Sequence, residues 1–230
     1  MLGLGNSVSA GQYPGGWSPT SLGGKLAHWY KFNTGITKVT ASSVDGQVSQ
    51  WADQHGSNNL TPTADDNKDV MPKLHNDGTV FFNATGDSLE FGSDLSFGKF
   101  SIYMNVNWKE DSTIATTEDL FEHASSGDFL KLAGPTAARI KISSRHDFTI
   151  NEMVEGTPFV LGYERNGDGD MMVYKDNVAG SAADGDSLNV AISTTIDLDR
   201  LGKPTNDSYW YEIVICDDIN ELFTYLSNVG

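Results

Sequence analysis

Short runs of hydrophobic and polar residues alternate along this 230-residue chain, as they do in proteins built from many short strands. The clearest alternation covers residues 101–108, where Ile102, Met104, Val106 and Trp108 would lie on one face and the residues between them on the other. A period of two with one face exposed to water is typical of an antiparallel sandwich strand.

Further candidate strands recur at roughly 8–12-residue spacing, each bounded by Gly, Pro, Asn or Asp. They are residues 26–32, 47–51, 80–82, 88–91, 120–123, 129–132, 139–142, 148–150, 159–165, 171–175 and 209–216. In the last of them Tyr211, Ile213 and Ile215 would share one face.

Two polar segments predict hairpin turns between neighbouring strands. Residues 83–87 separate the candidate strands 80–82 and 88–91, and residues 166–170 separate 159–165 from 171–175. Both segments contain glycine, which tolerates the positive φ that tight hairpin turns need. We therefore expect each pair of strands to be hydrogen-bonded neighbours.

The one convincing helix is 219–226, near the end of the chain. Asp218 is suited to cap it, and Glu221 can reach back to complete a capping box. Its apolar stripe consists of Ile219, Leu222, Phe223 and Leu226. Together these elements predict an all-β fold: a two-sheet antiparallel jelly-roll sandwich with one short C-terminal helix.

The start of the chain differs from the rest. Residues 1–22 are rich in Gly, Ser and Pro and carry no periodic pattern, so a flexible tail is one interpretation. Several apolar residues in this segment favour an extended arm that packs on this domain or on a neighbouring subunit. They are Leu2, Leu4, Val8, Tyr13 and Trp17. We divide the chain into an arm, 1–22, and a single jelly-roll domain, 23–230.

Charge and cysteine content narrow the function classes. Thirty-one acidic and fifteen basic residues give a formal net charge of −16, which disfavours nucleic-acid and anionic-membrane partners. Cys216 is the only cysteine, so it is expected to be a buried strand residue without a disulfide partner. No signal-peptide pattern opens the chain and no apolar run approaches eighteen residues. We expect synthesis in a cytoplasm and no membrane insertion.

Three segments carry a resemblance to a known superfamily. Gly46-Gln47-Val48-Ser49-Gln50-Trp51-Ala52-Asp53-Gln54-His55-Gly56 resembles a "V-S-x-W-x-D-x-S-G" stretch, with His55 where Ser is usual. Residues 80–89 are similar to an "F-D-G-x-x-D-x-L" segment, with Asn83 and Ala84 in place of Asp-Gly. Residues 211–215 resemble a closing "E-V/I-I-I-Y" strand.

In this order the segments resemble the concanavalin A-like lectin/glucanase superfamily, in its laminin-G-like branch. Residues 163–165 and 173–176 are similar to a further hairpin of that branch. The opening residues 1–7 resemble the start of structural proteins from marine tailed phages that carry such domains. The superfamily includes lectins, glycosidases and inert modules, so the resemblance implies a fold and leaves the function open.

The glucanases of this superfamily use two carboxylates in an "E-x-D-x-E" strand. The nearest match is Glu118-Asp119-Leu120-Phe121-Glu122, in which Glu118, Leu120 and Glu122 would share one face. Leu120 occupies the position of the central Asp. Four strand residues also span roughly 13 Å, against about 5–5.5 Å for a retaining pair. We therefore predict no catalytic residues and no enzyme activity.

Metal and cofactor sites are not predicted either. Asn166, Asp168 and Asp170 alternate as in a calcium loop, but Met171 stands where that loop needs glycine, so a hairpin turn is favoured. A surface calcium site on Asp168 and Asp170 is kept as an alternative. Tryptophans could stack on sugars, although a core position is favoured for Trp51 and Trp108.

These observations lead to three hypotheses of function. The first is a non-catalytic virion structural protein, located in the virion, that decorates a phage capsid or tail and contacts other virion proteins through its N-terminal arm. The alternative is a lectin-like carbohydrate-binding module that binds surface glycans for adhesion to the host. The third, a glycoside hydrolase, is disfavoured because Leu120 replaces the central acid.

Overall fold

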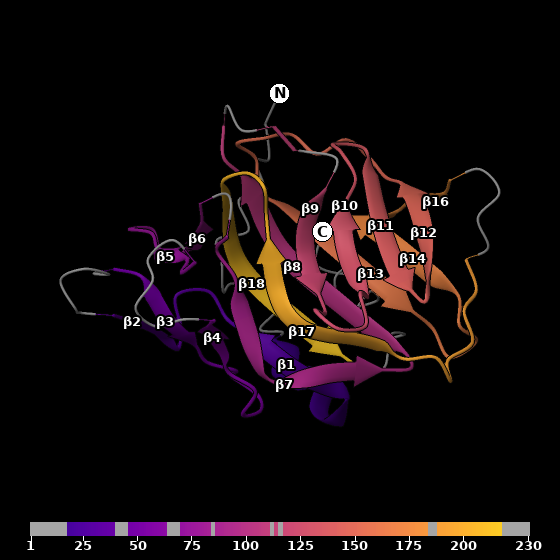
Figure 1. Ribbon diagram of the computed structural model, residues 1–230, viewed down its shortest axis with the longest axis horizontal. Coiled ribbons are helices and arrows are strands. Elements are labelled where there is room, and N and C mark those ends of the chain that lie inside the picture. Colours follow the sequence, from indigo (N-terminus) through magenta and orange to yellow (C-terminus); the bar gives the residue numbers. More distant parts are fainter. Residues whose placement is uncertain are drawn as a thin grey trace.

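The computed structural model describes residues 18–39, 46–63, 70–83, 86–110, 113–114, 117–183 and 188–217. Most of the predicted arm and the whole of the predicted helix 219–226, with its cap Asp218, lie outside these residues. Within them the chain forms two antiparallel sheets that pack as two layers around a common core (Figure 1). The predicted two-sheet sandwich is confirmed.

Sheet A has the strand order β15-β14-β13-β8-β18-β6-β5, and β1 also pairs with β18. Its strands are β1 (Leu26–Tyr30), β5 (Lys73–Leu74), β6 (Val80–Phe82), β8 (Phe100–Trp108), β13 (Phe159–Arg165), β14 (Met171–Lys175), β15 (Val178–Ala179) and β18 (Ser208–Cys216). Among the described helices, none is long and apolar enough to cross a membrane.

Sheet B has the order β16-β12-β11-β10-β9-β17-β7-β4-β3-β2. Its strands are β2 (Ile36–Lys38), β3 (Val48–Trp51), β4 (Leu60–Pro62), β7 (Leu89–Phe97), β9 (Glu118–Glu122), β10 (Phe129–Leu132), β11 (Ala137–Ile142), β12 (Ser144–Thr149), β16 (Ser181–Ala182) and β17 (Ile196–Lys203). β17 lies between β7 and β9 in the middle of the sheet, and the sequence pattern did not predict it.

The main core fills the space between the sheets, and its largest members are aromatic. Trp51, Trp108 and Trp210 are fully buried, which confirms the predicted core positions of the first two. The ring of Trp108 stacks on Phe159 with centroids 5.9 Å apart. Cys216 is buried on a strand, as predicted, but it packs outside this core.

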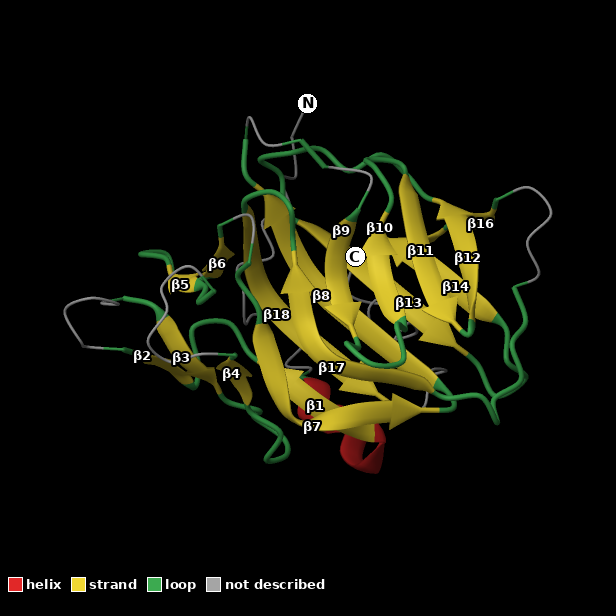
Figure 2. Cartoon of the chain, in the orientation of Figure 1, coloured by secondary structure: helices red, strands yellow, loops and turns green. Residues whose placement is uncertain are grey.

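The second face of β8 is not exposed to water, contrary to the prediction. Ile102, Met104, Val106 and Trp108 point into the core as expected, but Tyr103 on the opposite face is also buried. A second hydrophobic cluster covers that face, and it consists of Leu22, Leu26, Trp29, Tyr103, Val214 and Cys216. Leu22 comes from the 3-10 helix Pro19–Lys25, drawn in red in Figure 2. A sandwich strand in mid-sheet can thus be buried on both faces when another segment of the chain folds over its outer face.

One of the two predicted hairpins is correct and the other is wrong. β13 and β14 pair directly through the turn at residues 166–170. β6 and β7 belong to different sheets, since β6 pairs with β18 and β5, whereas β7 pairs with β17 and β4. The amide of Asn83 donates to the Asp87 carboxylate over 2.7 Å, so the segment has a local turn-like bond while the chain crosses between sheets.

A β-bulge changes the predicted face of Tyr211 in β18. The register with β8 shifts between Trp210 and Glu212, so one residue of β18 is left without its own partner. Trp210, Ile213 and Ile215 consequently point into the core. Tyr211 is displaced to the outside of sheet A, and the prediction that it shares a face with Ile213 and Ile215 is wrong.

Candidate functional site

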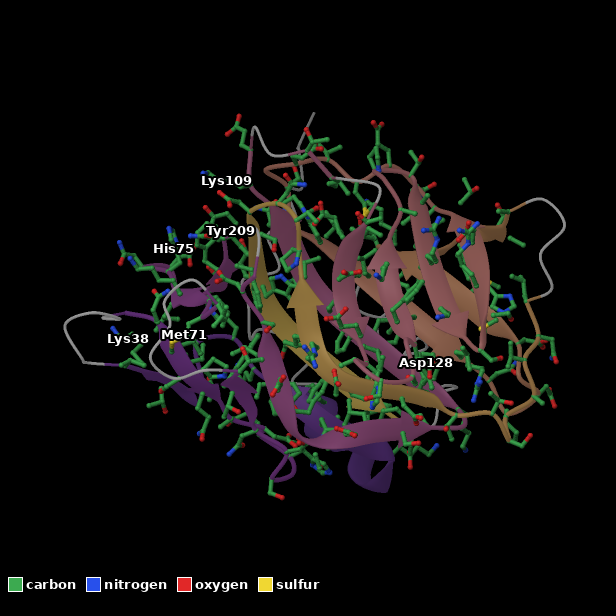
Figure 3. All side chains as sticks on the ribbon, viewed as in Figure 1. Lys38, Met71, His75, Lys109, Asp128 and Tyr209 are labelled. Atoms are coloured by element: carbon green, nitrogen blue, oxygen red, sulfur yellow. The ribbon has the colours of Figure 1, made fainter. Side chains whose placement is uncertain are left out.

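Five aromatic side chains gather on the outside of sheet A and stay partly or largely exposed. We call them the aromatic face: Phe32, His75, Phe81, Tyr209 and Tyr211. They come from the connection between β1 and β2, the turn between β5 and β6, β6 itself and β18. In Figure 3 the labelled His75 and Tyr209 lie close together at the end of the molecule formed by β5 and β6.

The centre of the aromatic face is a cross-strand pair. Phe81 and Tyr209 stand directly opposite each other on β6 and β18, with ring centroids 4.9 Å apart and planes inclined by 32°. The His75 ring meets Tyr209 edge-on at 5.3 Å. Phe32 and Tyr211 form a second, stacked pair at 5.9 Å. Cross-strand pairing thus holds Phe81 and Tyr209 side by side on the sheet, and the rings of His75 and Phe32 pack against β18 from neighbouring loops.

The local sequence explains why Phe81 points outward. In Val80-Phe81-Phe82 both neighbours are fully buried in the core, so the pleat directs the middle residue to the opposite face. Tyr211 reaches the same outer face through the bulge in β18, where its side chain hydrogen-bonds that of Asn107. Sequence reasoning missed this site because it considered tryptophans as sugar-stacking residues. The described tryptophans, Trp29, Trp51, Trp108 and Trp210, are all buried.

A carboxylate lies beside the rings, in the turn between β5 and β6. Oδ1 of Asp77 accepts hydrogen bonds from the Thr79 amide at 2.9 Å and the Thr79 hydroxyl at 2.7 Å, and His75 Nδ1 lies 3.2 Å away. Partial burial acts to raise the pKa of Asp77. The bonds from Thr79 and the contact with His75 outweigh it and hold the pKa below its ordinary value. About half of the side chain, 53%, is exposed.

The resemblance motif around Trp51 serves the fold. Asp53, whose side chain is fully buried, lies 2.7 Å from the Nδ1 atom of His28. It accepts hydrogen bonds from the amides of Trp29 and His55, each 3.0 Å long. These contacts tie β1 to the loop that follows β3. The contacts with His28 and Trp29 thus join two segments of the chain, and the bond from the His55 amide closes the turn after Asp53.

Glu118 and Glu122 do not share a face, and that prediction is wrong. The register between β9 and β10 shifts at Leu120, which opens a bulge and reverses the alternation. Glu118 is buried, where it accepts hydrogen bonds from the Thr205 amide at 2.7 Å and from Asn206.

Glu122 lies on the outside of sheet B, beside Arg200. That guanidinium stands between two carboxylates, 3.5 Å from Glu90 and 3.8 Å from Glu122, and it also contacts its neighbour Asp199. The positive charge of Arg200 thus offsets the negative charges of these three carboxylates. The two glutamates of the "E-x-D-x-E"-like segment are accordingly engaged in separate networks.

Amide side chains organise the turn that resembled a calcium loop. Oδ1 of Asn166 accepts hydrogen bonds from the amides of Asp168 and Asp170, at 2.9 and 2.8 Å. The Asp170 carboxylate in turn accepts one from Asn189 at 2.8 Å. The described residues contain no group of three or more His, Cys, Asp or Glu side chains placed to hold a metal ion.

Comparisons with protein-family models and with curated proteins find no match. Among solved structures the chain is similar to domain 4 of AbnA, a GH43 extracellular arabinanase from Geobacillus stearothermophilus, in complex with arabinotriose. The TM-score is 0.60 at 15% identity, and the match covers 89% of this chain and 98% of that one.

Two larger proteins contain a similar domain. Trypanosoma rangeli sialidase in complex with sialic acid gives a TM-score of 0.52 at 9% identity, covering 88% of this chain and 32% of the sialidase. The botulinum neurotoxin type G receptor binding domain gives 0.50 at 12%, covering 81% of this chain and 49% of that one. This chain thus spans about a third of the sialidase and half of the toxin domain. Its fold is the β-sandwich found in domains of glycosidases and in lectin-like domains.

Proposed function

We propose that this protein is a non-catalytic carbohydrate-binding module and that an oligosaccharide binds on its aromatic face. The observation that carries the proposal is the pair Phe81 and Tyr209, whose rings lie 4.9 Å apart and are partly exposed on the outside of the sheet. In a domain that buries its described tryptophans, a cluster of partly exposed rings indicates a binding surface.

The chemistry of the aromatic face suits a sugar. The C–H face of a sugar ring is apolar, so it can pack on an aromatic ring, while its hydroxyl groups need polar partners at the rim. Asp77 supplies a partly exposed carboxylate beside the rings. Rigid aromatic side chains lose little conformational entropy on binding, so a shallow surface of this kind can still bind.

The likeness to known structures supports the ligand class. Domain 4 of the arabinanase AbnA matches nearly the full length of this chain and was solved with arabinotriose. At 15% identity that likeness concerns the fold alone. That this chain also binds an oligosaccharide is part of our proposal. Glu118 and Glu122 belong to separate networks, which supports a module without glycosidase activity. Incubation with polysaccharides should therefore release no reducing sugar.

The test is a glycan array followed by titration calorimetry on the glycans that bind. Tyr209→Ala and Phe81→Ala should each weaken binding at least tenfold, since central aromatic residues carry much of the energy of such interfaces. Phe129→Ala is the matched control, because Phe129 is a partly exposed aromatic residue on β10 of the other sheet. Equal affinity of Tyr209→Ala and the unmodified protein, or the absence of any glycan that binds, would overturn the proposal.

A second proposal places this module on the surface of a tailed-phage particle, with residues 1–17 as the anchor. The similarity of residues 1–7 to phage structural proteins supports it. The two proposals are compatible, because a decorating protein can also bind glycans. Mass spectrometry of purified particles should find the chain. Deleting residues 1–17, which spares the buried Leu22, should abolish its incorporation and leave glycan binding intact. Absence of the full chain from particles would defeat this role.

A further inference from the structure

We infer that Asp77 accepts hydrogen bonds from the hydroxyl groups of the ligand, and that the aromatic face selects neutral over acidic oligosaccharides. The inference rests on the proposed function and deepens it. It follows from the geometry of one turn, from the charge of the surface beside the rings and from the charge of the whole chain.

The Asp77 carboxylate has one occupied and one open oxygen. Oδ1 accepts both hydrogen bonds from Thr79 and faces His75, whereas Oδ2 makes no hydrogen bond to any residue that the structure describes. The side chain is 53% exposed, so a ligand can approach the carboxylate from the solvent. A carboxylate with a free oxygen accepts strong, charge-assisted hydrogen bonds from hydroxyl groups.

The turn that carries Asp77 is fixed in place before any ligand binds. The Gly78 amide donates to the His75 carbonyl over 3.0 Å, and the His75 amide donates to the Thr79 carbonyl over 2.9 Å. Gly78 has φ of +94°, and a Cβ there would lie 2.9 Å from the Cβ of Asn33. Because the turn is closed by these bonds and packed on Asn33, little entropy is lost when a ligand binds its carboxylate.

Asp77 is connected to the aromatic face through His75. His75 links the two, since it contacts the Asp77 carboxylate through Nδ1 and the Tyr209 ring at 5.3 Å. The charge of Asp77 also raises the pKa of Tyr211, after the larger effect of burial, so the two side chains interact electrostatically. A sugar that extends from Phe81 and Tyr209 across His75 would thus reach the turn that carries Asp77.

Charge then decides between neutral and acidic sugars. A fixed carboxylate at the rim repels a uronate or sulfate group, so an acidic sugar should bind less tightly there than a neutral one. The net charge of −16 adds a long-range repulsion. The opposing cation is Lys73, the cross-strand partner of Phe81, which is exposed at the sheet edge. Because its positive charge would favour acidic sugars, the experiment also includes a variant of Lys73.

The experiment uses an array that holds neutral oligosaccharides and uronate- or sulfate-containing ones, probed with the full chain and its variants. Asp77→Asn keeps an oxygen for the Thr79 amide and removes the charge. It should weaken binding of the neutral glycans about tenfold, as expected for loss of a charged acceptor, and it should also bring in binding of acidic glycans. That gain would not arise from a merely structural role. Asp168→Asn, in the exposed turn between β13 and β14, is the control and should change nothing.

The possible outcomes distinguish a failure of this inference from a failure of the proposed function. Binding that is lost in Tyr209→Ala but unchanged in Asp77→Asn would overturn this inference and leave the proposed function standing. A preference of the unmodified protein for acidic glycans, lost in Lys73→Gln, would also overturn it. If no glycan binds, both fail. Asp77→Ser, whose hydroxyl can also accept from the Thr79 amide, repeats the test if Asp77→Asn lowers the melting temperature.

Discussion

The Nδ1 atom of His28 lies 2.7 Å from Oδ2 of Asp53, and this contact joins β1 to the loop after β3. Burial alone would raise the pKa of Asp53. The hydrogen bonds from His28 and from the amides of Trp29, His55 and Gly56 outweigh it, so the pKa lies well below the ordinary value. The stability that Asp53 contributes is therefore complete above its unfolded pKa of about 3.9 and is lost as the pH falls toward the lowered folded value.

Asp53→Asn should accordingly destabilise the fold by about 3 kcal/mol at pH 7, as expected when one partner of a buried, hydrogen-bonded charge is removed. Urea unfolding at pH 7 and at pH 3 measures the effect, and the difference from the unmodified protein should shrink at the lower pH. Equal free energies of unfolding at pH 7 would contradict the structural role of this carboxylate.

Glu164 has the opposite pH dependence. Burial raises its pKa, and the hydrogen bonds from Tyr103, Tyr174 and Ser101 lower it by less. A carboxyl group whose folded pKa exceeds the unfolded one contributes its full stability below the unfolded pKa of about 4.3. That contribution is lost as the pH rises through the folded value. Glu164→Gln should remove this loss. Its free energy of unfolding, measured relative to the unmodified protein, should thus increase between pH 4 and pH 7; a constant difference would refute the assignment.

Alternation predicts the face of a residue only where the strand is regular. It was correct for the inward face of β8, since the bulge in the pairing with β18 lies on β18, and for the β13–β14 hairpin, which pairs without a register shift. It failed at Tyr211, and β17 was missed altogether. In β17 the register shifts between Leu198 and Arg200, so Ile196, Leu198 and Leu201 point inward at uneven spacing. Bulges depend on the pairing with neighbouring strands, which a single sequence does not display.

The aromatic face was equally hidden in the sequence, for a different reason. Its members are spread from Phe32 to Tyr211 and meet only because β18 pairs with β6 and because the β18 bulge displaces Tyr211. One local signal was present. In a run of three apolar strand residues, Val80-Phe81-Phe82, the middle one must face away from its neighbours. An outward phenylalanine beside the turn residues Asp77 and Gly78 would have marked this edge as a candidate site.

The side chain of Arg165 links the turn between β7 and β8 to the segment before β17. It is fully buried, and its guanidinium donates to the carbonyl oxygens of Gly98, Phe97 and Thr194. Arg165→Met should destabilise the protein by about 3 kcal/mol or more, because those carbonyls would be left without these donors. Arg145→Met is the matched control, since that side chain is 61% exposed and should matter by less than about 0.5 kcal/mol. The free energies of unfolding of both variants are measured by chemical denaturation. Equal losses in the two variants would contradict a specific stabilising role of the buried Arg165.

Position 162 requires glycine because the ring of Tyr103 leaves no room for a side chain there. It pairs with Tyr103 of β8, and a Cβ at this position would lie 2.6 Å from the Cε1 atom of that ring. The ring has little freedom to move, because its hydroxyl donates to the buried Glu164. Gly162→Ala should therefore cost about 1–3 kcal/mol through overpacking.

A double-mutant cycle separates this overpacking from a loss of backbone flexibility. Tyr103→Leu removes the ring, so adding Gly162→Ala to it should cost much less than adding Gly162→Ala to the unmodified protein. The coupling free energy from urea unfolding should then exceed about 0.5 kcal/mol, the level at which contacting residues depart from additivity. Strictly additive effects would mean that the alanine acts on the backbone of β13. In that case the ring of Tyr103 would not be the reason for glycine at this position.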